Sequence, residues 1–210
     1  MITDLEQTIL NLTKHKPKGH FVQIGAAYST SDNEPCWHLL KKGWRGTFVE
    51  PNPRNCAGLI TTLIEQGYEN RYSLYMTAIA DKMGVQKFYM PRLYDSCSSL
   101  EPQWLDRMAF LQGQDPGPID TVYTTAITLN TLFDSVGTDF DLLCIDIEVT
   151  DEQLELIMNR VNWHRFNNLD VICLELISEH RLPDMLSPFG YRVMARYGDP
   201  NVTVLGRVYV

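Results

Sequence analysis

The feature that most constrains the fold is the alternation of short β-rich runs with helical stretches along almost the whole chain. The runs that predict core strands are residues 20–24, 46–49, 72–77, 142–145 and 171–174. Helical spacing or helix caps predict helices at 3–14, 35–42, 55–66, 129–136 and 150–161. Strands separated by helices pair in parallel, because a parallel pair needs a crossover connection. The pattern therefore predicts an α/β domain around a mostly parallel sheet.

Three segments depart from this alternation. Asp81–Gly84 predicts a hairpin turn leading into an added strand at 85–90, and residues 121–125 predict another strand. Between them, residues 91–118 are rich in Pro, Gly, Ser and Gln, and we expect an irregular insert with one short helix near 103–111. After a short helix at 182–189, the runs 191–197 and 202–208 flank Gly-Asp-Pro-Asn and predict a closing antiparallel hairpin.

The length of 210 residues predicts one domain, 1–210, whose first 19 residues form an N-terminal helix and its connection. The net charge is −8, and residues 108–159 hold ten Asp or Glu but no Lys or Arg. We therefore expect no nucleic-acid partner, since phosphate backbones are bound by Lys and Arg. We also expect no membrane span and no signal peptide. Five scattered cysteines favour a reduced, cytoplasmic protein.

The residues at the strand ends predict where a ligand binds. In open α/β sheets, ligands bind beyond the carboxyl ends of the strands, at the point where the strand order switches. Here the strand ends carry Gly25, Glu50, Thr77-Ala78, Asp146-Ile147-Glu148 and Glu175. Three of these five ends present a carboxylate, which predicts a polar site at this edge of the sheet.

Gly25 and Glu50 together indicate the kind of ligand. A glycine after a strand lets the backbone pass close to a ligand, although a plain turn explains it equally well. Ala26 and Ala27 follow it where a dinucleotide fingerprint needs further glycines, so a nicotinamide or flavin dinucleotide is disfavoured. Glu50 can accept hydrogen bonds from the hydroxyls of a ribose, or it is simply a solvated acid. An adenosine ligand without phosphates fits both residues, and S-adenosylmethionine is the obvious candidate.

The chain also resembles a known family. The order and spacing of its motifs from about residue 20 to residue 195 are similar to those of the FkbM-type S-adenosylmethionine-dependent methyltransferases. The motifs are Phe-Val-Gln-Ile-Gly-Ala-Ala at 21–27, Phe-Val-Glu-Pro-Asn-Pro at 48–53, Ala-Ile-Ala-Asp at 78–81, Ile-Asp-Ile-Glu at 145–148 and Leu-Glu at 174–175. The resemblance implies a class I methyltransferase (Rossmann-like) fold, with a seven-stranded sheet whose last strand is antiparallel. It also implies methylation of a hydroxyl on a sugar-bearing or natural-product small molecule.

The resemblance also implies roles for individual residues. Gly25 and Ala26 would lie at the methionine part of the cofactor, Glu50 at the ribose, and Ala78 and Ile79 beside the adenine. Ser98-Ser99 stands where the family often carries a serine pair. The full predicted cofactor-binding set is Gly25, Ala26, Ser29, Glu50, Pro51, Asn52, Ala78, Ile79, Ser98, Ser99 and Asp146.

Two departures from the family pattern leave a second hypothesis open. Gln23 and Ala27 replace the acid and the asparagine of the first motif, and Val149 replaces the glycine that usually follows Glu148. The first change removes a charge near the methionine end of the cofactor, and the second alters the loop nearest the chemistry. A catalytically inactive binding or scaffold protein with a methyltransferase fold is therefore the alternative.

Catalysis needs little beyond alignment, because the sulfonium already makes the methyl group electrophilic. A hydroxyl acceptor gains from a general base, and Asp146 is the first candidate, although it can equally just fix its loop. Glu148 lies two residues on and shares a face with Asp146 if the strand continues. That pair can hold a divalent cation, but two carboxylates are few ligands, so we expect no metal.

Two further features are candidates for contacting the acceptor. His180, five residues beyond Glu175, can reach it from the next loop, although a surface histidine is the simpler explanation. The insert at 91–118 carries Tyr94, Trp104 and Phe110 and is either an acceptor-binding lid or a cover for a sheet edge.

Overall fold

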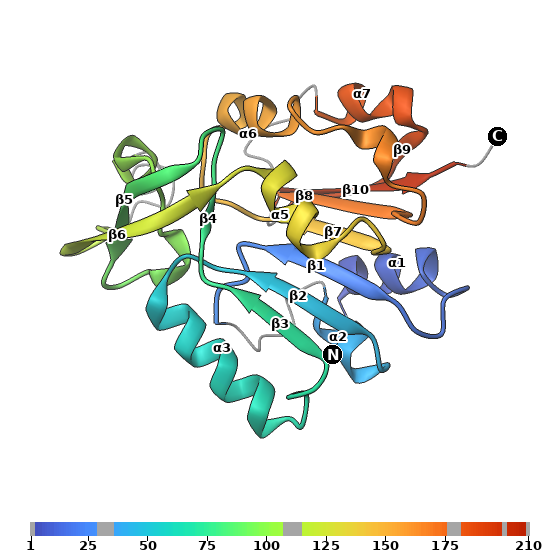
Figure 1. Ribbon diagram of the computed structural model, residues 1–210, viewed down its shortest axis with the longest axis horizontal. Coiled ribbons are helices and arrows are strands. Elements are labelled where there is room, and N and C mark those ends of the chain that lie inside the picture. The colour runs from blue at the N-terminus through green and yellow to red at the C-terminus, as the bar shows by residue number, and fades with distance from the viewer. Residues whose placement is uncertain (1–2, 29–35, 107–114, 176–181, 199–200, 209–210) are drawn as a thin grey trace.

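A seven-stranded sheet forms the centre of the protein (Figure 1), as seen in a computed structural model that describes residues 3–28, 36–106, 115–175, 182–198 and 201–208. Its strand order is β3-β2-β1-β7-β8-β10-β9. The strands are β1 (His20–Ile24), β2 (Arg45–Val49), β3 (Tyr72–Tyr75), β7 (Leu142–Ile145), β8 (Val171–Glu175), β9 (Tyr191–Gly198) and β10 (Asn201–Arg207). Strands β1, β2, β3, β7 and β8 run parallel to one another, whereas β10 runs antiparallel to β8 and β9. The predicted fold class and closing hairpin are confirmed.

Helices cover both faces of this sheet, and each face has its own hydrophobic core. One face carries α1 (Asp4–Leu12), α2 (Trp37–Lys41) and α3 (Pro53–Glu65). The other carries α5 (Leu129–Val136), α6 (Asp151–Met158) and α7 (Leu182–Leu186), with the short turns η2 (Trp163–Arg165) and η3 (Ser187–Phe189). In Figure 1, α6 and α7 lie above the sheet and α3 lies below it. A parallel sheet buried on both faces explains why its strands read as nearly continuous apolar runs.

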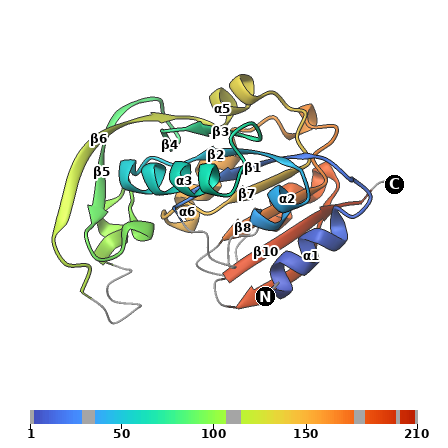
Figure 2. The same cartoon turned by 90° about the horizontal axis from the view of Figure 1, so that it is seen from below.

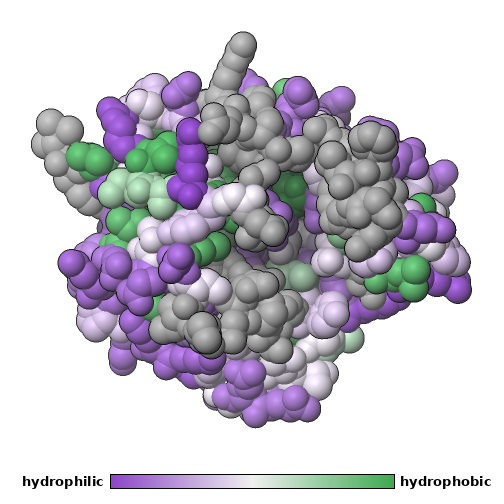
Figure 3. Space-filling model, turned by 180° about the vertical axis from the view of Figure 1, so that it is seen from behind, coloured by the Kyte–Doolittle hydropathy of each residue, from purple (hydrophilic) through white to green (hydrophobic). Residues whose placement is uncertain are grey.

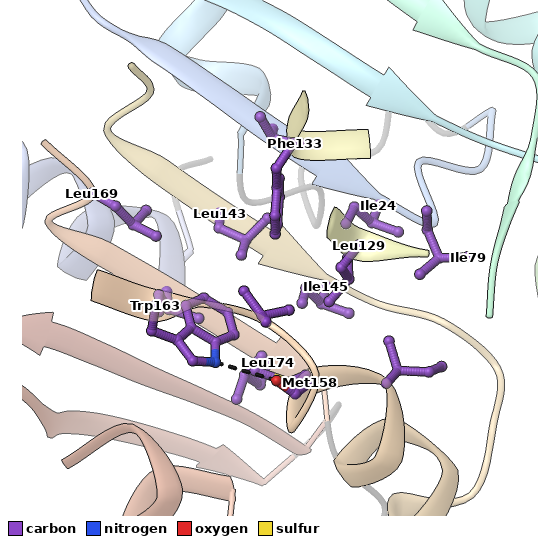
Figure 4. Packing of buried hydrophobic residues seen from close by; sticks show 14 of the residues in the cluster. Ile24, Ile79, Leu129, Phe133, Leu143, Ile145, Met158, Trp163, Leu169 and Leu174 are labelled. Carbon is purple, nitrogen blue, oxygen red and sulfur yellow. Dashed lines mark hydrogen bonds between the residues drawn. The ribbon is translucent and has the colours of Figure 1, made fainter. Parts of the chain in front are cut away.

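Figure 4 shows the core beneath α5 and α6, where side chains from helices and strands interlock. Phe133 of α5 points toward Leu143 of β7, and both are fully buried. Trp163 is also buried, and its indole N–H donates a hydrogen bond to the Met158 carbonyl at 3.2 Å. This core fixes the strands whose ends carry the candidate site.

Four of the described helices begin at a residue whose side chain caps the first turn. The Thr3 hydroxyl accepts a hydrogen bond from the Glu6 N–H while the Thr3 N–H donates to the Glu6 carboxylate, which is the predicted capping box of α1. Thr150 caps α6 through the Gln153 N–H, as predicted. By contrast, α3 begins at Pro53, two residues before the predicted start. The reason is that Asn52 caps it and proline suits the first turn of a helix.

A second, three-stranded sheet corrects the predicted hairpin at Asp81–Gly84. It has the order β4-β6-β5, with β4 (Ala78–Ile79), β6 (Ile119–Ile127) and β5 (Gly84–Pro91). The turn does not join two paired strands, because β4 and β5 lie on opposite sides of β6. The antiparallel partner of β5 is β6, which follows it only after residues 92–118. Figures 1 and 2 show β5 and β6 beyond the carboxyl ends of the central strands.

The insert predicted at residues 91–118 is shorter than expected. Its first part also contains regular structure. Pro91 belongs to β5, and a short turn, η1 (Asp95–Cys97), is followed by helical residues at 102–106. The predicted short helix near 103–111 is thus confirmed at its beginning, and its end lies outside the described residues.

None of the helices in the described ranges is long and apolar enough to cross a membrane. On the face shown in Figure 3, hydrophobic residues form small separate patches among hydrophilic ones.

Candidate functional site

The strand order switches between β1 and β7, and Gly25 and Asp146 follow the ends of these two strands. The Asp146 N–H donates to the Ile24 carbonyl at 2.9 Å. Gly25 has a φ of +77°, and a Cβ atom on it would lie 1.5 Å from the Asp146 carbonyl oxygen. A glycine is therefore required here by the close approach of the two strand ends themselves. The sequence alone left two explanations for this glycine, close approach to a ligand and a plain turn.

Glu50 ends β2 and is held by backbone N–H groups. Its two carboxylate oxygens accept hydrogen bonds from the Ala27 N–H at 2.8 Å and from the Asn52 N–H at 2.7 Å. The residue is only 4% exposed. Ala27 has a φ of +47°, the only positive value among the described non-glycine residues, and this conformation points its N–H at Glu50. Glu50 thus connects the turn after β1 to the start of α3.

Asn52, Ser98 and Ser99 join the segment after β5 to the main sheet. The Asn52 side chain caps α3 through the Arg54 N–H and donates to the Ser98 hydroxyl at 3.1 Å. The Ser99 hydroxyl donates to the Glu148 carbonyl at 2.5 Å. These contacts place the predicted serine pair against both the Glu50 loop and the loop after β7.

Asp146, Glu148 and Glu175 form a cluster of carboxylates, here called the acidic cluster, at the ends of β7 and β8. Ile145 pairs with Leu174 in the parallel register, which puts Asp146 beside Glu175, and these two side chains are hydrogen-bonded. Because β7 ends at Ile145, Asp146 and Glu148 do not share a strand face as expected. The sequence pattern places Glu175 at a strand end, but Glu175 is not among the predicted site residues.

Electrostatics in the acidic cluster disfavour full ionisation. Burial, together with the negative charge of Glu175, raises the pKa of Glu148 to about 8. The indole N–H of Trp104 is directed at the Glu148 carboxylate and partly offsets this rise. Burial also raises the pKa of Glu175, and the hydrogen bond that it shares with Asp146 opposes that change. The pKa of the Cys97 thiol rises to about 11, because the thiol is buried and lies near these carboxylates.

The other predicted site residues lie in different surroundings. Ala78 and Ile79 form β4, pair with Ala126 and Ile127 of β6, and are each 4% exposed. Pro51 is half-buried between Glu50 and α3. Ala26 is buried, with its N–H donating to the Val49 carbonyl. Ser29 and His180 lie outside the described residues. Within the described ranges, no group of three His, Cys, Asp or Glu side chains is arranged to hold a metal ion.

The raised pKa of Glu148 predicts a pH-dependent stability. In the folded protein this pKa is about 8, against 4.5 for an unperturbed glutamate, so the folded state holds the proton more tightly than the unfolded chain. That contribution to stability is complete below pH 4.5 and is lost as the pH rises toward 8. Glu148→Gln removes this titration. The Tm of the variant relative to wild type should therefore increase by roughly 3 °C or more between pH 6 and pH 9, since 1 kcal/mol shifts Tm by about 2–4 °C. Calorimetric melting at both pH values checks this, and a Tm difference that does not change with pH contradicts it.

The chain is similar to known proteins in its sequence profile and in its fold. The profile of the methyltransferase FkbM domain matches residues 23–152. No curated protein sequence matches the chain significantly. Among solved structures, it is similar to a methyltransferase FkbM from Methylobacillus flagellatus, with a TM-score of 0.53 and 14% identity over 90% of this chain. The chain spans 44% of the length of that protein.

Two other solved structures share the fold. One is a magnesium protoporphyrin IX methyltransferase from Synechocystis with bound S-adenosylmethionine, with a TM-score of 0.52 and 8% identity over 97% of this chain and 78% of the other. The second is a protein of the NADB-Rossmann superfamily from Streptococcus agalactiae, with a TM-score of 0.51 and 9% identity over 100% of this chain and 70% of the other. At these identities the likeness concerns the fold.

Proposed function

The chain belongs to the FkbM methyltransferase family, and from this premise we propose that it transfers the methyl group of S-adenosylmethionine to a hydroxyl of a sugar-bearing or natural-product small molecule. The main observation in support of this proposal is that three features lie together where the strand order switches. These are the turn at Gly25, the buried carboxylate of Glu50, and the acidic cluster that begins at Asp146.

The residues at this edge fit an adenosyl cofactor. The Gly25–Ala27 turn exposes no bulky side chain toward the switch point, and Glu50 stands at the end of the next strand, where a ribose would lie. Carboxylate oxygens accept more than one hydrogen bond, so holding backbone N–H groups is compatible with accepting ribose hydroxyls as well. The bound cofactor supplies an electrophilic methyl group on sulfur.

A hydroxyl nucleophile needs its proton removed as it attacks, and we assign this to Asp146. Asp146 lies at the end of β7, next to the switch point, and its side chain is hydrogen-bonded to Glu175. This contact orients the Asp146 carboxylate. We further infer that residues 92–106 line the acceptor side of the site, because Ser99 and Trp104 both approach Glu148.

Binding of the cofactor is the first test. A ligand that binds only the folded state adds about 2.7 kcal/mol at a hundredfold excess over its dissociation constant, which is visible as a rise in Tm. S-adenosylmethionine and S-adenosylhomocysteine should both raise the Tm, whereas NAD should not. No change with either compound at millimolar concentration contradicts the proposal and is the result expected of an inactive scaffold.

Asp146→Asn tests the assignment of the base. The amide cannot accept the acceptor's proton, so we expect the rate of methyl transfer to fall about 10²–10⁴-fold. The affinity for S-adenosylhomocysteine should change far less. The two quantities are measured by transfer of a labelled methyl group and by calorimetric titration. A fully active variant removes Asp146 from the mechanism.

A further inference from the structure

Ser98 and Ser99 are neighbours whose hydroxyl groups contact two different loops of the site. The Ser98 hydroxyl accepts a hydrogen bond from the Asn52 side chain at 3.1 Å, and Asn52 belongs to the loop after β2 that also holds Glu50. The Ser99 hydroxyl donates to the Glu148 carbonyl in the loop after β7. Neighbouring side chains point to opposite sides where the backbone is extended, as it is at Ser98. This explains how one serine pair reaches both loops.

Glu101 adds a second contact to the loop after β7. Its carboxylate accepts a hydrogen bond from the Thr150 N–H at 3.4 Å, and its own N–H donates to the Ser99 hydroxyl at 3.0 Å. The Ser99 hydroxyl is therefore an acceptor and a donor at once, and the residue is only 2% exposed. Residues 98–101, here called the bridging segment, thus join the two loops through side-chain hydrogen bonds.

The bridging segment is itself anchored to the second sheet. Ser99 and Tyr89 of β5 exchange two backbone hydrogen bonds, at 2.9 and 3.0 Å. Leu100 packs against a small apolar cluster formed by Ala78, Ala80 and Ala126. Because β1 lies between β2 and β7 in the central sheet, the two loops start about 10 Å apart, which is two strand spacings. The bridging segment is thus a support that spans the distance between them.

Resting on the proposed methyl transfer, we propose that Ser98 and Ser99 are positioning residues that couple the cofactor side of the site to the loop after β7. A cofactor held by Glu50 restrains the loop after β2, and the hydrogen bond between Asn52 and Ser98 extends that restraint to the bridging segment. The bridging segment in turn holds the loop that begins at Asp146. Contacts made by single hydrogen bonds open and close within the folded protein, so ligand binding can shift their population. Cofactor binding thereby orders the acceptor side of the site.

Amide hydrogen exchange followed by NMR, with and without saturating S-adenosylhomocysteine, tests this coupling. The reporter is the Thr150 N–H, whose acceptor is the Glu101 carboxylate. In wild type the ligand should slow exchange at this amide at least about fivefold, as expected for the strengthening of one hydrogen bond. In Ser98→Ala the slowing should fall to about twofold or less, because the link to Asn52 is lost. Ser96→Ala, which removes the same hydroxyl from an exposed position nearby, should keep the full slowing.

Ser98→Ala is expected to fold, because Asn52 caps α3 through its side-chain oxygen and contacts Ser98 through its nitrogen. Ser98→Thr keeps the hydroxyl and should restore the slowing. Ser99→Ala removes the contact at the other loop, so exchange at Thr150 should be faster without ligand and should respond to the ligand no more than in Ser98→Ala.

The outcomes separate coupling from two simpler explanations. If the ligand protects the loop after β7 by touching it directly, or if the serine pair only stabilises the fold, Ser98→Ala will show the same slowing as wild type, and the proposal is overturned. It is also overturned if S-adenosylhomocysteine binds wild type without slowing exchange at Thr150, while the proposed function stands. If S-adenosylhomocysteine does not bind wild type at all, the proposed function fails and this coupling fails with it.

Discussion

Replacing Gly25 by alanine is expected to lower the free energy of unfolding by about 4 kcal/mol or more, a loss at the extreme of single substitutions. Two costs combine at this position. The backbone has a φ of +77°, which costs a residue with a side chain about 1–2 kcal/mol. In addition, the new Cβ would lie 1.5 Å from the Asp146 carbonyl oxygen, and backbone atoms on both strands must move to relieve the overlap. Chemical denaturation followed by circular dichroism measures the loss.

Gly67→Ala is the matched control for this prediction. Gly67 has a φ of +74°, almost the same as Gly25, but a Cβ there would meet nothing within 4 Å. Only the conformational cost remains, so the control should lose about 1–2 kcal/mol. Equal losses in the two variants would show that β1 and β7 separate freely at this end. The close approach at the strand-order switch would then not be a requirement of the fold.

This comparison also shows what the sequence can and cannot reveal about Gly25. A glycine directly after a β-rich run predicts a turn and a close approach, and both are present. The identity of the approaching atoms depends on which strand lies beside β1. That neighbour is β7, more than a hundred residues later in the chain. Local periodicity carries no information on such pairings, so the sequence could not distinguish a plain turn from a close approach to a ligand.

The lack of local sequence information on strand pairing also explains the other differences between prediction and structure. The β-rich runs predict the central strands well. Each of these strands is buried on both faces, so its own residues are nearly all apolar. The pairing of β5 with β6 cannot be predicted from the sequence of either strand, since 27 residues separate Pro91 from Ile119. The contact of Asp146 with Glu175 follows from strand order and register, so it became visible only once β7 and β8 were seen as neighbours.

Glu50 illustrates a residue whose predicted role and observed contacts must be separated by experiment. Glu50→Ala would abolish any ribose contact, but it would also leave the N–H groups of Ala27 and Asn52 without their acceptor. A buried unsatisfied donor costs about 1–3 kcal/mol, so loss of binding in that variant would be mixed with loss of structure. Glu50→Gln is the sharper test, because it keeps the size of the side chain and one acceptor oxygen.

In Glu50→Gln, the affinity for S-adenosylhomocysteine is expected to fall about a hundredfold. Hydrogen bonds to a charged group contribute about 1.5–3 kcal/mol each, and the amide retains only one of the two oxygens and none of the charge. Calorimetric titration measures the affinity, and the Tm of the ligand-free variant shows separately how much stability is lost. Glu148→Gln is the control, because it removes a buried carboxylate from the same edge of the sheet away from the predicted ribose position. Its affinity for S-adenosylhomocysteine should stay near that of wild type. If Glu50→Gln binds as tightly as wild type, Glu50 serves only to join the turn after β1 to α3, and the ribose must be held by other groups.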